Sequence, residues 1–225
     1  MRFCISSIAQ IRNGPMNAPA ESTQRRLTQA RRLLAIAQTG LHYTTGAFDR
    51  ERYQELLGIA QTQLAELAEI STEEVVQLFS REEGYANPKL DVRCAVFDDT
   101  GHVLLVREAA DGLWSLPGGW ADIGASPAEN AMREVWEESG YTVTIERLLA
   151  VWDILKHQHP PSVFHIWKLV FLGKIVSSGD ISGVETNAVD FFPIDALPPL
   201  SQGRILPEQI RRLSELRSNG GMEFD

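Results

Sequence analysis

The chain has 225 residues, 44% of them hydrophobic, and a formal net charge of −9 at pH 7. That length supports a packed core without covalent cross-links, and two cysteines are too few for a disulfide framework, so a cytoplasmic protein is expected. Because nucleic-acid backbones are bound by clustered Lys and Arg, the acidic balance argues against a nucleic-acid partner, and no membrane span is expected.

The N-terminal third predicts a short leader followed by helices. Residues 1–20 carry a short apolar stretch broken by polar residues, which is typical of a flexible leader and not of a membrane anchor. Apolar residues then recur at helical spacing in three segments, so residues 21–86 are predicted to form a small all-helical domain. Its helices are expected over residues 22–38, 49–69 and 71–84, with Asp49 and Ser71 as N-caps.

The pattern changes at the sequence GYANP, residues 84–88, and a second domain is predicted over residues 87–225. Short apolar runs replace the helical spacing there, which is typical of strands. The turn sequence DDTG at residues 98–101 predicts a hairpin between the first two strands. Strands are expected over residues 92–97, 103–106, 143–149, 164–172 and 189–192, and helices over residues 126–140 and 207–217.

The helix predicted at residues 126–140 carries a cluster of glutamates. Ser126 and Glu129 form a capping box at its start, and Gly140 is a typical helix stop. Three glutamates follow at i, i+3 and i+4, so their carboxylates share one patch of the helix surface. Such a patch is either a solvated acidic face or half of a site for a hard divalent cation, with a phosphate as the other half. These glutamates are Glu134, Glu137 and Glu138.

A glycine pair, Gly118 and Gly119, precedes this helix. Glycine lets the backbone approach a ligand or a neighbouring side chain closely, although glycine pairs are also common in ordinary turns. The combination of a glycine loop with an acidic helix favours a site for a phosphate-bearing ligand.

The segment from Gly119 to Tyr141 resembles the Nudix box, G-x5-E-x7-R-E-U-x-E-E-x-G-U, in which U is an apolar residue. The one named position that departs from the pattern is Ala125, where the family has a glutamate. The positions that fit are Gly119, Arg133, Glu134, Val135, Glu137, Glu138, Gly140 and Tyr141.

The resemblance implies an α/β fold, an alpha/beta/alpha sandwich with a mixed sheet, preceded here by the helical domain. It implies that Glu134, Glu137 and Glu138 bind Mg²⁺ or Mn²⁺ and that water attacks a phosphorus of a nucleoside diphosphate linked to a moiety X. Arg133 would orient a glutamate or contact phosphate. By the same resemblance the catalytic base would be Glu137 or Glu185, the latter in a late loop where Ala188 stands at a position that relatives commonly fill with a glutamate.

Substrate contacts are expected from the glycine pair and from three longer side chains. Arginine suits phosphate oxygens, which makes Arg93 and Arg107 candidates, although strand arginines are often only solubilising. Trp120 follows the glycine pair directly and could stack on a base or face a cationic group.

Beyond the box, the chain is similar to bacterial Nudix hydrolases with a helical N-terminal domain, among which are CDP-choline pyrophosphatases. The segments that carry this likeness include residues 35–56, 87–108 and 157–171. The resemblance implies a homodimer that converts CDP-choline to CMP and phosphocholine. Two alternatives stay open: a pyrophosphatase for ADP-ribose or another nucleotide sugar, and a weakly active nucleotide-binding sensor built on the same fold.

Overall fold

The computed structural model describes residues 21–80, 82–179 and 185–225, so the predicted leader lies outside the described residues. The chain divides into two compact units. The first contains the described residues up to Pro88 together with Pro160–His165, and the second contains Lys89–His159 and Ile166–Asp225. The segment 160–165, which the sequence places in the second domain, therefore packs with the helices. No helix in the described part of the chain has the length and apolar character that a membrane crossing requires.

The helical unit consists of α1 (Glu21–Tyr43), α2 (Ala47–Ala68) and α3 (Thr72–Phe79). Apolar side chains from all three helices, including Leu27, Leu64 and Val75, are fully buried in one core. This confirms that helical spacing of apolar residues reports a shared buried face. The segment 160–165 adds Phe164, whose ring lies 5.1 Å from that of Phe79.

The predicted helix ends in this unit are wrong in three places. The first helix continues through Gly40 to Tyr43, and a β-carbon at Gly40 would overlap the ring of Tyr53 on α2. Gly40 therefore permits close helix packing and does not end the helix. The N-cap of α2 is Gly46, and α3 ends at Phe79 and not near Gly84.

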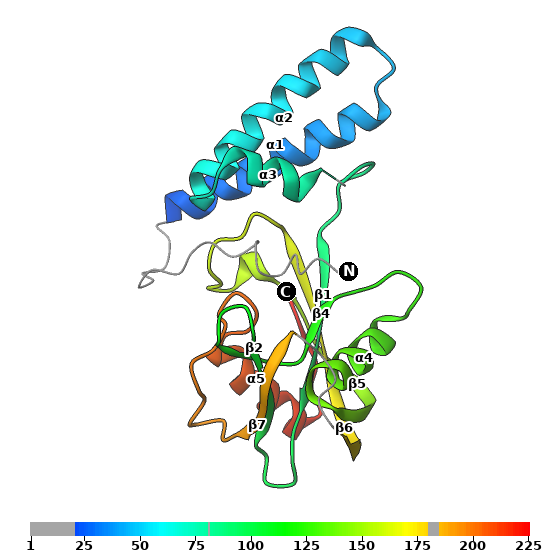
Figure 1. The fold of residues 1–225 in the computed structure, drawn as a ribbon, viewed down its shortest axis with the longest axis vertical. Helices are drawn as coiled ribbons and strands as arrows, with labels where there is room; N and C mark the ends of the chain where they lie inside the picture. The colour runs from blue at the N-terminus through cyan, green and yellow to red at the C-terminus, as the bar shows by residue number, and fades with distance from the viewer. Residues whose placement is uncertain (1–20, 81, 180–184) are drawn as a thin grey trace. The chain divides into compact units, whose positions relative to one another are not determined.

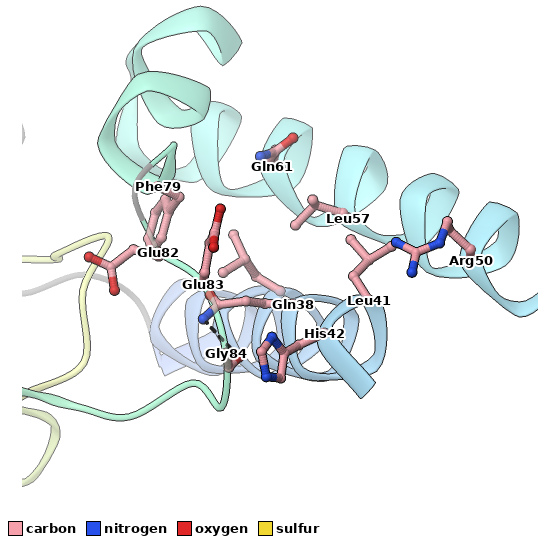
Figure 2. Close-up of a pocket in the computed structure, with 11 residues that line it drawn as sticks. Gln38, Leu41, His42, Arg50, Leu57, Gln61, Phe79, Glu82, Glu83 and Gly84 are labelled. Carbon is pink, nitrogen blue, oxygen red and sulfur yellow. Dashed lines mark hydrogen bonds between the residues drawn. The ribbon is translucent and has the colours of Figure 1, made fainter. Parts of the chain in front are cut away.

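A cavity of about 360 Å³ lies within the helical unit, between α1, α2 and the chain that follows α3 (Figure 2). Its wall includes Leu34, Leu57 and Phe79, with Arg50 and Glu83 among its charged residues. The Nε2 atom of Gln38 donates to the carbonyl of Gly84 at 3.4 Å beside it. None of the glutamates of the acidic helix lines this cavity.

The second unit is a mixed α/β structure, as predicted. One sheet has the strand order β4-β1-β6-β5-β8 and the other β3-β2-β7. The first sheet is mixed because β1 runs parallel to β6 and antiparallel to β4. The strands are β1 (Lys89–Val96), β2 (Val103–Glu108), β3 (Trp114–Ser115), β4 (Gly118–Trp120), β5 (Tyr141–Asp153), β6 (Ile166–Ser178), β7 (Thr186–Phe192) and β8 (Glu223–Phe224), and the helices are α4 (Pro127–Ser139) and α5 (Pro207–Asn219).

Alternation along the strands builds two cores, one that includes side chains of α4 and one that includes side chains of α5. Figure 1 shows the ribbons of these two helices beside the strands. On β1, Val92 and Cys94 pack with Ala131 and Val135 of α4. Ala95, the next residue along the strand, faces the other way and packs in the core that contains Leu213 of α5. Period-two alternation therefore places a helix on each face of the sheet structure, which gives the expected sandwich.

Two strand predictions need correction. The turn at residues 98–101 forms, with the Asp98 carboxylate accepting from the backbone of Thr100 and His102 at 2.9 Å. The flanking strands, however, meet only at an isolated bridge between Phe97 and Val103 and then enter different sheets, so no regular hairpin exists. The short strands β3, β4 and β8 were not predicted, because two or three residues carry no readable alternation.

Candidate active site

Helix α4 presents the glutamate cluster, and local sequence determines where it begins and ends. The Ser126 hydroxyl accepts from the Glu129 backbone at 3.2 Å, and the Glu129 carboxylate accepts from the Ser126 backbone at 2.7 Å. Gly140 ends the helix at a φ of 74°. Ala131 and Val135 are fully buried against the sheet, so the residues between them are held in a defined orientation.

Glu138 is the most buried of the three glutamates, at 5% exposure. Its Oε2 accepts from the backbone N–H of Gly118 at 2.8 Å, so the glycine loop binds the helix directly. Burial raises the pKa of Glu138 well above its usual range, and the nearby carboxylate of Glu108 raises it further. The guanidinium of Arg93 and the Gly118 N–H only partly offset these effects on the pKa.

Glu134 lies against the second glycine of the loop. A β-carbon on Gly119 would come within 3.3 Å of its Oε2, and its side chain is 12% exposed. Burial raises the pKa of Glu134, as do the charges of Glu137 and Glu185, while Arg133 and Arg93 lower it. The effect of Glu185 on this pKa means that its carboxylate lies within electrostatic reach of Glu134.

Arg133 connects the glutamates to each other. Its Nη2 forms an ion pair with Glu134 Oε1 at 2.8 Å, and its Nη1 donates to Glu137 Oε2 at 3.2 Å. The same Nη2 pairs with Asp122 at 3.2 Å and donates to Asn130 Oδ1 at 3.0 Å. Partial burial lowers the pKa of Arg133, but these three carboxylates raise it overall.

The donor set suits a hard divalent cation. Carboxylate oxygens are the ligands that Mg²⁺ prefers. Glu138 is buried and Glu134 is 12% exposed, and burial is the main cause that raises the pKa of both carboxyl groups, which disfavours their negative charge. A bound cation would balance that charge. Within the described residues, no three His, Cys, Asp or Glu side chains already converge as a ready-made metal site. Arg133, paired with Glu134 and Glu137, supplies positive charge between those two glutamates in this structure.

Two of the predicted substrate contacts, Arg107 and Trp120, and the candidate base Glu185 are at least partly exposed. Arg107 is exposed on β2 and donates to Asn187 Oδ1 at 2.6 Å, in register with Ala188 on β7. Trp120 is partly exposed on β4, opposite Asp91 of β1. Glu185 is exposed just before β7, and its carbonyl accepts from Ala109 at 2.9 Å. Their contact with substrate, and the role of Glu185 as base, stay predictions.

Arg93 is buried, unlike an exposed strand arginine that only improves solubility. It is only 5% exposed, and its guanidinium donates to Asp91 at 3.0 Å and to the carbonyl of Leu116 at 2.9 Å. Asp91 also pairs with Lys168, which is 1% exposed. These contacts occupy Arg93 within a buried charge network, and substrate contact by Arg93 stays a prediction.

The sequence reasoning missed this network and its neighbour around Glu108. Glu108 is buried, accepts from the Ser115 hydroxyl at 2.7 Å and pairs with Arg204 at 2.9 Å. Lys168, inside the predicted strand 164–172, was the available signal, because a charge within an apolar run is either on an exposed face or paired in the core. Asp91 and Glu108 lie just outside the predicted strands, so the sequence pattern did not mark them.

The two glycines should respond differently to substitution. Gly118 has a φ of 145°, and its β-carbon would lie 2.8 Å from Arg93 Cα, so alanine there would strain the fold. In Gly119→Ala the new methyl would displace only the flexible carboxylate of Glu134. We expect Gly119→Ala to fold normally and to lose between about 3- and 10-fold in kcat, because small displacements of catalytic groups are costly.

The measurement is kcat together with the thermal midpoint for both variants. Gly58→Ala serves as the control, since a β-carbon there has nothing within 4 Å and the residue lies in α2. It should raise stability by about 0.5–1 kcal/mol and leave kcat unchanged. Wild-type kcat in Gly119→Ala would contradict the placement of Glu134.

Comparison with known proteins decides the family. The NUDIX domain model matches residues 87–213, which is more than half of the chain. The chain belongs to the Nudix family. A second family description, "UDP-X-like, N-terminal oligomerisation domain", matches residues 24–79 of this Nudix protein.

Named relatives resemble this Nudix chain over most of its length. YjhB of Bacillus subtilis (strain 168), provisionally named an ADP-ribose pyrophosphatase, is 46% identical over 187 residues, which is 83% of this chain and 89% of that protein. The crystal structure of a UDP-X diphosphatase has a TM-score of 0.59 and 35% identity, covering 90% of this chain and 99% of that one. An ADP-ribose pyrophosphatase structure from Streptococcus suis 89-1591 has a TM-score of 0.55 and 38% identity, covering 62% of this chain and 100% of that one. The chain is therefore a Nudix hydrolase of the nucleoside diphosphate-X class.

Proposed function

We propose that this Nudix hydrolase cleaves the pyrophosphate bond of a nucleoside diphosphate linked to a small moiety, at Glu134, Glu137 and Glu138 with Mg²⁺ or Mn²⁺. One observation carries the proposal: Glu138 is hydrogen-bonded to Gly118, and Glu134 lies against Gly119, so the acidic helix and the glycine loop form one site. That arrangement brings carboxylates to a backbone segment that a phosphate can approach closely.

In the proposed reaction, a water oxygen attaches to one phosphorus and the bridging P–O bond of the diphosphate breaks. The products are a nucleoside monophosphate and the phosphorylated moiety. The divalent cation, when bound, neutralises phosphate charge and lowers the pKa of the attacking water. Arg133 keeps the carboxylates of Glu134 and Glu137 oriented toward each other through its two nitrogens.

A carboxylate must take the proton of the attacking water, and two candidates are near the site. Glu137 lies on α4 with a side chain 34% exposed, and Glu185 lies close enough to affect the pKa of Glu134. Glu137 and Glu185 are both candidates for the base. Glu185→Gln and Glu137→Gln are compared by kcat and by Mn²⁺ affinity. A loss of kcat at unchanged Mn²⁺ affinity in Glu185→Gln identifies Glu185 as the base, whereas wild-type kcat in that variant leaves Glu137 as the base.

Three substrates follow from the resemblance and the relatives. CDP-choline, giving CMP and phosphocholine, comes from the similarity of the whole chain to Nudix enzymes with a helical N-terminal domain. ADP-ribose and UDP-linked compounds come from the names of the relatives. All three contain the same diphosphate linkage, so the metal site serves each, and the nucleoside and the moiety X together decide among them.

The test is hydrolysis of a panel comprising CDP-choline, ADP-ribose, a UDP-linked sugar, NADH, diadenosine polyphosphates and nucleoside triphosphates, each with Mg²⁺, Mn²⁺ or EDTA. We expect metal-dependent release of a nucleoside monophosphate from one of the first three compounds. Tight binding of a nucleotide with no turnover in any metal would contradict the proposal and indicate a nucleotide-binding sensor.

The helical unit supports an oligomer, since it matches a domain described as an oligomerisation domain. Exposed apolar side chains on its helices, among them Phe48 at 77% and Ile59 at 48%, are available for burial in a partner. We propose a homodimer. Light scattering should give twice the 25.1 kDa of one chain for the full-length protein, and the mass of one chain for a variant starting at Lys89. A full-length monomer would contradict this assignment.

A further inference from the structure

Asp122 lies in the loop between β4 and α4 and pairs with the arginine of the Nudix box. The ion pair joins Asp122 Oδ2 to Arg133 Nη2 at 3.2 Å. The other carboxylates bound to Arg133, those of Glu134 and Glu137, come from the same helix as the arginine itself. Asp122 is therefore the carboxylate that ties the guanidinium to the loop.

Asn130 holds this loop in place. Its side chain is fully buried, its Oδ1 accepts from the Asp122 backbone N–H at 3.0 Å, and its Nδ2 donates to the Asp122 carbonyl at 3.2 Å. The same amide donates to the carbonyls of Ala125 and Ser126 at 3.3 and 3.1 Å. Its Oδ1 also accepts from Arg133 Nη2 at 3.0 Å. One buried amide thus joins the backbone at 122 and 125 to the guanidinium.

Ala125, whose carbonyl Asn130 binds, occupies a named position of the Nudix box. The box pattern has a glutamate there, and in this chain the side chain carries no charge and is exposed. The Ala125 carbonyl and Arg133 bind the same Asn130 amide, and we expect a glutamate side chain at position 125 to be long enough to reach the guanidinium. Asp122 already supplies a carboxylate to that guanidinium.

We propose that Asp122 is a positioning residue that replaces the missing box glutamate by anchoring Arg133. Arg133 has one positive charge and three carboxylate partners, and Asp122 is the partner that holds the guanidinium from the loop. Without Asp122, the guanidinium is free to move toward Glu137, which it contacts at 3.2 Å, and competes with the divalent cation for the glutamate oxygens. Asp122 thereby keeps the metal-binding carboxylates available.

The inference rests on the proposed function and is tested with Asp122→Ala and the double variant Asp122→Ala/Ala125→Glu. Mn²⁺ affinity is measured by electron paramagnetic resonance, and kcat and KM on the substrate that the panel identifies. Loss of a partner behind metal ligands typically costs about 10- to 100-fold, and because the Asp122 side chain is 52% exposed we expect the lower end, about 10-fold in kcat and in Mn²⁺ affinity.

The double variant should recover most of both losses, because the Ala125→Glu substitution would return a carboxylate to the same guanidinium. Asp99→Ala, which removes one charge from the exposed turn between β1 and β2, should match the wild type and exclude an effect of net charge. KM should change less than kcat, and the thermal midpoint of every variant should equal that of the wild type.

Wild-type kcat and Mn²⁺ affinity in Asp122→Ala would overturn the inference, as would losses that the second substitution fails to recover. If the wild type cleaves no compound of the panel, the proposed function fails, and the Mn²⁺ affinities of the same variants still decide the role of Asp122.

Discussion

Replacement of Glu138 by glutamine is expected to abolish hydrolysis while leaving the protein at least as stable as the wild type. The side chain is 5% exposed and accepts from the Gly118 N–H at 2.8 Å, a bond that the glutamine carbonyl can also accept. The substitution removes a negative charge that is buried near the carboxylates of Glu108 and Glu134. Shape and hydrogen bonding are therefore kept, and the ligand charge is lost.

The expected loss in kcat is about 1,000-fold or more. A catalytic cation contributes several kcal/mol to stabilisation of the transition state, and each factor of ten in rate corresponds to about 1.36 kcal/mol. We expect the variant to gain stability because burial and neighbouring negative charges raise the pKa of Glu138 and so disfavour its ionised form at neutral pH. The uncharged glutamine removes this unfavourable charge. In EDTA, the thermal midpoint of Glu138→Gln should equal or exceed that of the wild type.

Glu146→Gln is the matched control, since it makes the same chemical change at an exposed residue of β5. It should retain wild-type kcat and stability. A Glu138→Gln variant that keeps its activity would remove Glu138 from the metal site, and one that unfolds would contradict the expected gain in stability.

Removal of the Asp91 carboxylate is expected to produce the largest loss of stability in the second unit. Asp91 is 4% exposed and pairs with Arg93 and Lys168, which are 5% and 1% exposed. Asp91→Ala leaves two buried cations without this partner. Breaking a buried ion pair by removing one member typically costs about 3–5 kcal/mol, because the remaining charge is uncompensated. Urea unfolding gives the free energy directly.

The pH dependence of unfolding provides a second measurement. Burial raises the pKa of Asp91, but Arg93 and Lys168 lower it overall from its ordinary value near 3.8. The ionised carboxylate therefore stabilises the fold above pH 3.8, and this contribution is lost as the pH falls below 3.8 through the pKa of the folded state. The difference in stability between wild type and Asp91→Ala should shrink in that acidic range.

Asp190→Ala, at an exposed position of β7, is the control and should stay within about 0.5 kcal/mol of the wild type. Equal stabilities of Asp91→Ala and Asp190→Ala at neutral pH would contradict the assignment of a stabilising buried network.

Features of this protein that depend on near neighbours in the chain were readable from the sequence. The capping box of Ser126 and Glu129, the stop at Gly140 and the shared face of the three glutamates follow from spacings of three or four residues along one helix. The α/β class followed from the change of hydrophobic period near residue 88. The Nudix box combined these local signals, so the family and the hydrolase activity were predicted correctly.

Contacts between distant segments were decided only by the tertiary structure. The sequence predicted the end of the first helix near residue 38, but the helix continues past Gly40, which packs against Tyr53 of α2. Arg93 was a candidate for phosphate contact, and the structure pairs it with the buried Asp91, which also binds Lys168. Residues 91 and 168 meet because β1 and β6 are paired in parallel.

In the candidate site, too, the sequence predicted what lies on one helix, and the tertiary structure decided what contacts that helix. Sequence spacing placed the glutamates on one face of α4, but their surroundings depend on the chain that folds against that helix. The Gly118 N–H reaches Glu138, and Asp122 reaches Arg133, across a loop whose course is held by the buried amide of Asn130. Residue spacing along a helix determines which side chains share a face, whereas packing determines which of them are buried, paired and able to act.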